Sequence, residues 1–329
     1  MRTPIQNPAR HDPDNPAACA ERQPRRYIVD NQHSGYPSYS SNRQNFRMTN
    51  GDNEIAGTLT AQEVERYHHD GYLSPVQATT LKRAADLLAH YDAFKARGEA
   101  AADGVLRSKP HLVFPWLYDL VRDPAVTGPV RAILGPNLLA WGSSFFAKPA
   151  GDPGFVSWHQ DANYWGLEPH EILTAWIAFS PSLRENGCMR VLPGSQTAAL
   201  DHRDTFAKDN LLTRGQEISV DVDENRAVNI TLEPGEMSLH HVGIVHGSDP
   251  NTSDIPRIGF AIRYIASHVR QTGGRTTATL ARGEDTHGHF DLEPRPQSEY
   301  DAASLVFRQM ALARQHSVLF AGVDNPVAG

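Results

Sequence analysis

Hydrophobic positions along the chain follow a helical period towards both ends and a strand-like period in the middle. Helical spacing is predicted in four stretches: 60–70, 78–91, 115–121 and 301–314. The first stretch opens on Thr60 and Glu63, the capping-box signature of a helix N-terminus. Between Leu138 and Tyr264, short stretches alternate apolar and polar positions, as strands do. This pattern predicts a mainly β fold with flanking helices, a double-stranded β-helix of the cupin-like jelly-roll type.

One predicted strand carries two side chains that suit a metal ion. It reads Phe155-Val-Ser-Trp-His159-Gln-Asp161 and is rich in residues that favour an extended backbone. Because residues i and i+2 of a strand share a face, His159 and Asp161 are predicted to offer an imidazole nitrogen and a carboxylate oxygen to one ion. The predicted third ligand is His246, which follows Asp161 by 85 positions (246 − 161) at the end of a second predicted strand, 236–246. Two histidines and one carboxylate hold Fe(II) in non-haem oxygenases and leave three coordination positions open.

The pattern His-any-Asp recurs in the chain, so context decides which copy binds metal. The copy at His68 falls in the predicted first helix, where residues i and i+2 do not face each other. His202 lies in a polar run that we interpret as a solvated loop, and His289 lies in a segment without strand period. Context therefore favours the copy at His159.

A turn rich in Gly, Ser, Asp, Pro and Asn follows His246 and leads into a new predicted strand that begins at Arg257. Arg257 and Arg263 share one face of this strand, with only small residues between them. A guanidinium beside a metal site suits bidentate capture of a carboxylate. Six residues of strand span about 20 Å, which favours Arg257 for this role and leaves Arg263 as a candidate substrate contact. His240, in phase with His246 by strand alternation, either contacts substrate or fills the barrel.

With these residues the chain resembles the phytanoyl-CoA dioxygenase family of Fe(II)- and 2-oxoglutarate-dependent oxygenases. The resemblance runs from about Leu59 to Tyr264. The matching segments are Leu59–Leu73, Phe146-Ala-Lys148-Pro, Trp158-His-Gln-Asp161, Leu173–Phe179, Glu185–Ser195 and the block from His246 to Arg257. Several ordered matches with the expected spacing are more specific than any single motif.

The resemblance implies that His159, Asp161 and His246 bind Fe(II) and form the catalytic centre, with 2-oxoglutarate and dioxygen as co-substrates. By this similarity, Arg257 binds the distal carboxylate of 2-oxoglutarate. Further positions that match the family's co-substrate pocket are Gln160, Trp176 and Ser248, with Lys148 as an addition.

Two positions bear on how this chain compares with its relatives. Related halogenases have a small residue in place of the metal-binding carboxylate, so the presence of Asp161 favours hydroxylation over chlorination. Where many family members have histidine after Pro-Gly-Ser, this chain has Gln196. The change implies a different local hydrogen bond or a different substrate.

The remaining stretches differ in composition from the predicted core, 56–329, which we expect to form a single oxygenase domain. Residues 1–55 are rich in Asn, Pro, Arg and Ser and poor in apolar residues, so we interpret them as a mobile or surface-draped arm, with a substrate lid or oligomer contact as the alternative. The polar segments 197–228 and 265–300 show no clear period and are predicted to be loops that set substrate specificity. Their candidate arginines, for each of which simple solvation is the plainer interpretation, are Arg203, Arg214, Arg270, Arg275 and Arg282.

Composition narrows the class of protein further. A chain of 329 residues with 40% hydrophobic content can bury one large core. The net charge of −7, without a basic aromatic stripe or a phosphate loop, argues against nucleic acid as a partner. Cys19 and Cys188 stand alone, so neither a disulfide framework nor a cysteine metal site is expected.

No apolar run has membrane-span length, and the N-terminus lacks a signal-peptide core. We therefore expect a cytoplasmic protein with no membrane partner. The sequence leaves open whether the protein forms a homo-oligomer.

These observations predict a dioxygenase that hydroxylates an unactivated C–H bond of a small polar metabolite or natural-product intermediate and releases succinate and CO2. Desaturation, cyclisation and epimerisation are alternatives, because all can begin with the same hydrogen abstraction. Two alternatives belong to other classes. A zinc hydrolase can use the three ligands around a metal-bound water, and a non-catalytic jelly-roll module can keep the fold alone, but neither needs Arg257.

Overall fold

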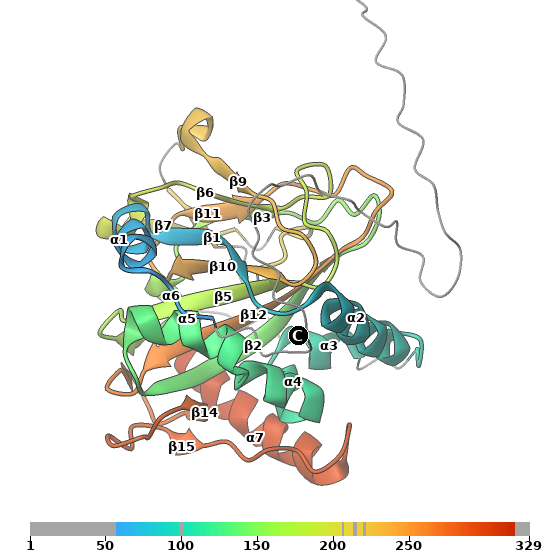
Figure 1. Cartoon of the computed structure of the whole chain (residues 1–329), viewed down its shortest axis with the longest axis vertical. Coiled ribbons are helices and arrows are strands. Elements are labelled where there is room, and N and C mark those ends of the chain that lie inside the picture. The colour runs from blue at the N-terminus through green and yellow to red at the C-terminus, as the bar shows by residue number, and fades with distance from the viewer. Residues whose placement is uncertain (1–56, 99–101, 206, 213–215, 220–221, 320–329) are drawn as a thin grey trace, which may run out of the picture. The chain divides into compact units, whose positions relative to one another are not determined.

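Two main sheets organise the chain in the computed structural model (Figure 1), which describes residues 57–98, 102–205, 207–212, 216–219 and 222–319. The larger sheet has the strand order β1 (Tyr72–Gln77), β10 (Glu236–His241), β5 (Ile172–Ala178), β12 (Arg257–Ala266), β2 (Leu138–Lys148), β14 (Thr277–Arg282) and β15 (Asp291–Leu292). The smaller sheet has the order β3 (Val156–His159), β11 (His246–Ser248), β6 (Met189–Val191) and β9 (Val228–Ile230). Two short ribbons pair β4 (Leu167–Glu168) with β13 (Arg270–Gln271), and β7 (His202–Asp204) with β8 (Gln216–Ile218).

The two main sheets pack face to face. One hydrophobic cluster joins them, and its buried members are Trp176, Ala178 and Ala261 from the larger sheet, Met189, Val191 and Ile230 from the smaller sheet, and Leu232 and Ile244 from the connections. Neighbouring strands run antiparallel, apart from the parallel pair β14 and β15. The predicted double-stranded β-helix is therefore confirmed.

Helices cover the face of the larger sheet that points away from the smaller sheet (Figure 1). In chain order the described helices are α1 (Ala61–Asp70), α2 (Leu81–Lys95), α3 (Ala102–Arg107), α4 (Pro115–Val121), α5 (Pro124–Leu134), α6 (Ala162–Trp165) and α7 (Ala302–Leu319), with 3-10 turns η1 (Pro110–Leu112), η2 (Ser195–Thr197) and η3 (Glu224–Arg226). Of these, α1 packs against the edge strand β1 and α6 is a single turn after β3, so neither belongs to this cover. Tyr91 of α2 packs on Phe145 of β2, with ring centroids 4.8 Å apart. The Tyr264 hydroxyl of β12 donates to the Val121 carbonyl at the end of α4, at 2.7 Å. Since helices take this outer face, alternate residues of β12, β5 and β10 point between the sheets.

The helices expected from spacing are present. In α1 the Glu63 amide donates to Thr60 Oγ1 at 3.2 Å and the Thr60 amide donates to Glu63 Oε2 at 2.8 Å, so the predicted capping box forms. The stretches predicted around 78–91, 115–121 and 301–314 correspond to α2, α4 and α7. Within the described residues, no helix combines the length and the apolar character needed to cross a bilayer.

The prediction of two long polar loops was wrong. The segment 197–228 contains β7, β8 and η3, and the segment 265–300 contains β13, β14 and β15. Most of these strands have only two or three residues, too few to show a period in sequence. The latter segment even supplies a buried acid, Glu293, which accepts hydrogen bonds from Lys109 Nζ and from the Thr277 and Thr279 hydroxyls. The predicted arm, residues 1–55, lies outside the described residues.

Candidate active site

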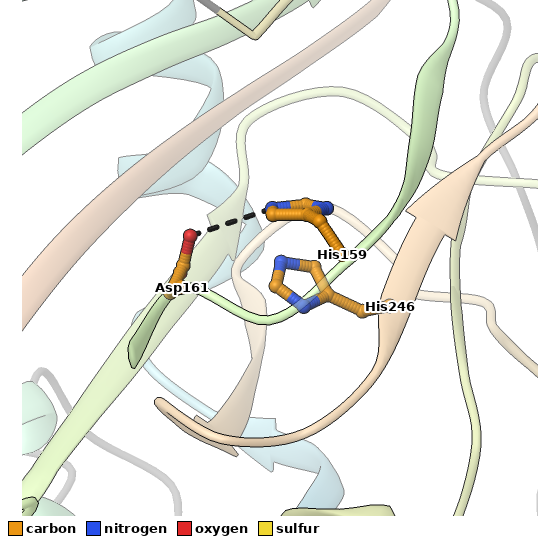
Figure 2. A group of neighbouring side chains, drawn as sticks. All are labelled: His159, Asp161 and His246. Carbon is orange, nitrogen blue, oxygen red and sulfur yellow. Dashed lines mark ion pairs between the residues drawn. The ribbon is translucent and has the colours of Figure 1, made fainter. Parts of the chain in front are cut away.

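Three side chains of the types that bind metal ions gather between the two sheets. Figure 2 shows His159, Asp161 and His246 pointing toward one another, and one ligand atom from each lies within 4.8 Å of the other two. His159 ends β3 and His246 begins β11, and the two residues are register partners in the smaller sheet. Their ring centroids lie 4.1 Å apart, and His159 Nε2 lies 3.4 Å from Asp161 Oδ1. The metal group predicted from sequence is thus assembled in space.

The backbone brings these groups together differently from the prediction. The expected strand does not continue to Asp161, because β3 ends at His159 and Asp161 has helical dihedral angles (φ −64°, ψ −33°) at the start of α6. The chain turns at Asp161, and this turn directs the carboxylate into the site. The predicted strand alternation is therefore not what places Asp161 beside His159. The expected strand from 236 to 246 is also broken, since β10 ends at His241 and a turn leads to β11 in the other sheet. His240 therefore faces His246 across the sheets, with ring centroids 5.1 Å apart.

Both histidines form a hydrogen bond through Nδ1, which leaves Nε2 of each ring to face the site. His159 Nδ1 lies 2.9 Å from the Ser157 carbonyl oxygen, and His246 Nδ1 lies 3.0 Å from the Ile244 carbonyl oxygen. A carbonyl only accepts, so each Nδ1 carries the hydrogen and each Nε2 keeps a lone pair for a metal. Fixing the tautomer by a backbone carbonyl is the usual way in which proteins orient metal-binding histidines.

The charge states also suit a metal. Burial raises the pKa of the Asp161 carboxyl, but the adjacent His159 and His246 rings outweigh it and hold this pKa well below its usual range. Burial, with the neighbouring His159, lowers the pKa of His246 to about 4. A carboxylate and a neutral imidazole are the forms that bind metal ions. The donor set, two nitrogens and one carboxylate oxygen, fits the facial triad of Fe(II) oxygenases.

Two buried cations lie at one end of this site. Arg257 on β12 and Lys148 on β2 are register partners, and each is at most 2% exposed. Lys148 Nζ donates to Ser248 Oγ at 2.7 Å, while Arg257 donates from Nη1 to the Gly187 carbonyl and lies over the Trp176 ring, 5.4 Å from its centroid. Across the described residues neither cation forms an ion pair, and Arg257 Nε has no hydrogen-bond partner. Buried charges are normally paired, so this pocket fits an anionic ligand.

The Trp176 ring that supports Arg257 requires a glycine beside it. A Cβ added at Gly259 would lie 1.9 Å from the Trp176 ring, closer than any real contact. The small residue that the sequence places between the two arginines therefore makes room for the ring on the same face of the sheet.

Gln160 does not share this pocket. Its side-chain amide donates to the Ala198 carbonyl at 2.7 Å and the Gly243 carbonyl at 2.6 Å, and it accepts from the Leu200 amide at 2.9 Å. Both amide hydrogens are thus used by loop carbonyls, and none is left for a co-substrate. We leave Gln160 out of the proposed co-substrate site and assign it to the anchoring of the loop after η2.

Gln196, the departure from the family pattern, has a structural partner. Its amide donates to the carbonyls of His68 and His69 at 3.1 Å each. These carbonyls belong to the last turn of α1, where backbone acceptors lack helical partners. These two hydrogen bonds tie α1 to the segment after β6.

His202 was wrongly interpreted as a residue of a solvated loop. It belongs to β7, and its Nε2 accepts a hydrogen bond from the backbone N–H of Gln160 at 2.9 Å. His202 therefore lies beside the metal group but is not a member of it. A depression of about 290 Å³ lies here, lined by Asn163, Tyr164, Leu200, Asp201, His202 and Asp204. Alternation could not reveal this position, because β7 is only three residues long.

The arginines of the polar segments contact groups outside the metal site. Arg203 lies 3.5 Å from Glu217, Arg270 lies 3.8 Å from Glu168 and Arg275 lies 2.7 Å from Asp291. Arg282 donates to Thr127 Oγ1 at 3.3 Å, and Arg214 lies outside the described residues. These contacts give the four described arginines structural partners and no place beside the metal group.

Sequence reasoning missed two buried hydroxyls on the inner face of the larger sheet. Thr174 Oγ1 and Ser238 Oγ have no hydrogen-bond partner within the described residues. Thr174 lies two positions before Trp176 on β5, and Ser238 lies two positions before His240 on β10, so strand alternation was the signal that could have found them.

A jelly roll that holds two histidines and a carboxylate beside two buried cations defines the class of Fe(II)- and 2-oxoglutarate-dependent oxygenases. Comparison with known families agrees with this class. The sequence profile of the family described as phytanoyl-CoA dioxygenase (PhyH) matches residues 49–259, well over half of the chain. The chain belongs to this family.

Individual relatives are similar over most of their length. The probable alpha-ketoglutarate-dependent hypophosphite dioxygenase of Stutzerimonas stutzeri is 30% identical over 234 residues, which cover 68% of this chain and 78% of that protein. The ectoine dioxygenase of Streptomyces avermitilis is 26% identical over 270 residues, 74% of this chain and 90% of that protein. The apo structure of the non-heme monooxygenase ThoJ is 37% identical, with a TM-score of 0.72, and covers 80% of this chain and 99% of ThoJ.

The protein is therefore a dioxygenase that depends on Fe(II) and 2-oxoglutarate and uses dioxygen. The zinc-hydrolase and binding-module alternatives give no role to the buried cations at Lys148 and Arg257. They are also at odds with the family, whose similar members are named dioxygenases.

Proposed function

We propose that this enzyme hydroxylates an unactivated C–H bond of a small polar metabolite or natural-product intermediate. His159, Asp161 and His246 hold Fe(II) in this proposal, and Arg257, with Lys148 and Ser248, binds the distal carboxylate of 2-oxoglutarate against the Trp176 ring. The observation that carries the proposal is the pairing of a buried metal group with two buried cations that have no ion-pair partner in the described chain.

When bound, Fe(II) with 2-oxoglutarate supplies the oxidising power: substrate, 2-oxoglutarate and O2 become hydroxylated substrate, succinate and CO2. The protein's part is placement and the exclusion of water. The carbonyls of Ser157 and Ile244 fix both imidazoles, so their Nε2 atoms stay directed at the metal. Arg257 and Lys148 orient the co-substrate from one end of the site. Asp161 would be a ligand of the iron where related halogenases have a small residue, which favours hydroxylation over chlorination.

The substrate class follows from two features. The relatives are named for ectoine and hypophosphite, both small polar molecules. On this chain's own inner face, His240 and Arg263 are polar side chains beside the metal group that the co-substrate pocket does not use. We assign both to the substrate.

Binding of 2-oxoglutarate should weaken as pH rises above about 7. Burial, with the charge of Arg257, lowers the pKa of Lys148 to about 7, although Asp152, Asp249 and Cys188 act in the opposite direction. Only the ammonium form attracts the carboxylate, so binding is full below this pKa and falls by up to about tenfold per pH unit above it, until the higher pKa of the complex is reached. The measurement is the dissociation constant of 2-oxoglutarate between pH 6 and 9. A Lys148→Met variant, of similar length without charge, should bind weakly and lose the pH dependence, and a wild-type constant that stays flat would remove Lys148 from the site.

The reaction type is tested by mass spectrometry of products formed under 18O2. A panel of polar metabolites is incubated with enzyme, Fe(II) and 2-oxoglutarate, and molecules that stimulate succinate release are analysed. Hydroxylation adds one oxygen atom from O2, raising the mass by 18 units under 18O2. A product two mass units lighter than its substrate would replace hydroxylation by desaturation or cyclisation, and an unchanged mass with inverted configuration would indicate epimerisation.

A further inference from the structure

A row of four residues crosses the inner face of the larger sheet at the end away from Arg257. Arg263 of β12 pairs in register with Thr174 of β5, Thr174 with His240 of β10, and His240 with Tyr72 of β1. These strands are neighbours in the sheet, as Figure 1 shows. Register partners in antiparallel strands point to the same face, so the four side chains lie side by side.

Arg263 is a guanidinium held in place without a direct ion pair in the described chain, although the Asp161 carboxylate is close enough to act on its charge. It is flanked by the rings of Phe146 and Trp165, whose centroids lie 5.6 and 5.8 Å from the guanidinium carbon. It donates to Ser144 Oγ at 2.6 Å, and no carboxylate lies within ion-pair distance of it in the described chain. Its neighbours Ile262 and Tyr264, on the other face of the strand, are fully buried, whereas Arg263 itself is partly exposed to solvent.

Two further polar atoms of the row lack partners. Thr174 and His240 are 3% and 2% exposed, and neither Thr174 Oγ1 nor His240 Nδ1 has a hydrogen-bond partner within the described residues. Buried polar atoms usually have hydrogen-bond partners, so two adjacent ones without a partner in the described chain suit a polar ligand. A hydroxyl and a neutral imidazole can both donate, as the guanidinium does, so the row offers donors to one oxyanion.

The row is next to the metal group. The His240 ring centroid lies 5.1 Å from that of His246, and the Trp165 ring that flanks Arg263 belongs to the turn that Asp161 opens. Arg257 stands six residues away along β12, about 20 Å of strand. The two arginines therefore lie at opposite ends of the inner face. The proposed co-substrate pocket is at the Arg257 end, and the Arg263 end is left for the molecule that is oxidised.

We propose that Arg263, Thr174 and His240 bind an anionic group of the primary substrate, a carboxylate or another oxyanion, and so fix the reacting carbon beside the metal. This inference rests on the proposed function and narrows its substrate class to acids. Arg263 supplies the charge and, with its flanking rings, the orientation. Thr174 and His240 supply directed hydrogen bonds, which are weaker to a neutral amide or ester because these groups carry no negative charge.

The test compares acids with their amides as ligands of the anaerobic Fe(II) and 2-oxoglutarate complex. The probes are benzoate and a set of N-acetyl amino acids, each beside its primary amide, and binding is read from tryptophan fluorescence and from thermal shift. We expect at least one acid to bind at least tenfold more tightly than its amide. Arg263→Gln should remove this preference, Arg263→Lys should keep part of it, and Thr174→Val, of nearly the same shape, should weaken acid binding severalfold.

The affinity for 2-oxoglutarate is measured on the same variants from the visible band of its Fe(II) complex. This measurement distinguishes a failure of the substrate-site inference from a failure of the proposed function. We expect it to change less than twofold in Arg263→Gln and Thr174→Val. If these variants lose 2-oxoglutarate affinity instead, the row belongs to the co-substrate and the inference is overturned. It is also overturned if no acid binds better than its amide, or if Thr174→Val and a folded Arg263→Gln leave the preference intact. A wild-type protein that forms no 2-oxoglutarate complex would refute the proposed function itself.

Discussion

Replacing His159 by alanine should lower substrate-dependent succinate formation by more than about 100-fold. Loss of an outer partner of a metal ligand already costs about 10- to 100-fold in metal affinity or activity, and loss of the ligand itself costs more. His159 is 3% exposed and its Nε2 lies 3.4 Å from Asp161, and the metal group formed by the described residues has no further histidine to take its place. The measurement is succinate release at saturating 2-oxoglutarate, together with iron content after desalting.

The matched control is His68→Ala. His68 begins another His-any-Asp pattern, but it is exposed on α1 and lies outside the metal group. Its replacement should leave iron content and turnover at wild-type levels. Full coupled turnover in a folded His159→Ala variant would show that the first ligand is wrongly assigned.

Replacing Arg257 by alanine should weaken 2-oxoglutarate binding about 30-fold or more while leaving iron binding intact. Removing one member of a buried, hydrogen-bonded charge pair costs about 2–5 kcal/mol, and the lower value corresponds to about 30-fold in affinity. Burial lowers the pKa of Arg257 only to about 10, so the guanidinium is charged at neutral pH and ready to pair with a carboxylate. The measurements are the apparent KM for 2-oxoglutarate and kcat at saturation.

Two variants accompany this prediction. Arg257→Lys keeps the charge but loses the bidentate geometry, so its KM should rise less than that of the alanine variant. Arg270→Ala removes an exposed arginine that lies 3.8 Å from Glu168, and its KM should stay at the wild-type value. An unchanged affinity in folded Arg257→Ala would move the carboxylate site elsewhere, with Arg263 the next candidate.

Features set by local sequence could be predicted. Thr60 and Glu63 cap α1 because a capping box needs only residues three positions apart. The strand beginning at Arg257 forms because apolar alternation and a preceding turn are both local signals. The identity of His159, Asp161 and His246 as a group also came from sequence, through their context and the resemblance to a family.

Features set by packing could not be predicted. The turn that takes Asp161 out of β3, and the turn that moves His246 into the other sheet, depend on how the two sheets meet. Glu293 reads as part of a polar loop, yet it is buried beside Lys109, a partner 184 residues away in sequence that no local pattern could reveal. Thr174 became a candidate only when the register placed it between Arg263 and His240.

The most direct test of the central claim is anaerobic titration of the metal-free protein with Fe(II) and then 2-oxoglutarate, followed by visible absorption. A chelated 2-oxo acid on Fe(II) gives a weak charge-transfer band. We predict that this band appears at one equivalent of iron, is absent in His246→Ala, and needs far more 2-oxoglutarate in Arg257→Ala. A folded, iron-loaded wild-type protein that shows no band, or a His246→Ala variant whose band is undiminished, would contradict the assignment of this site.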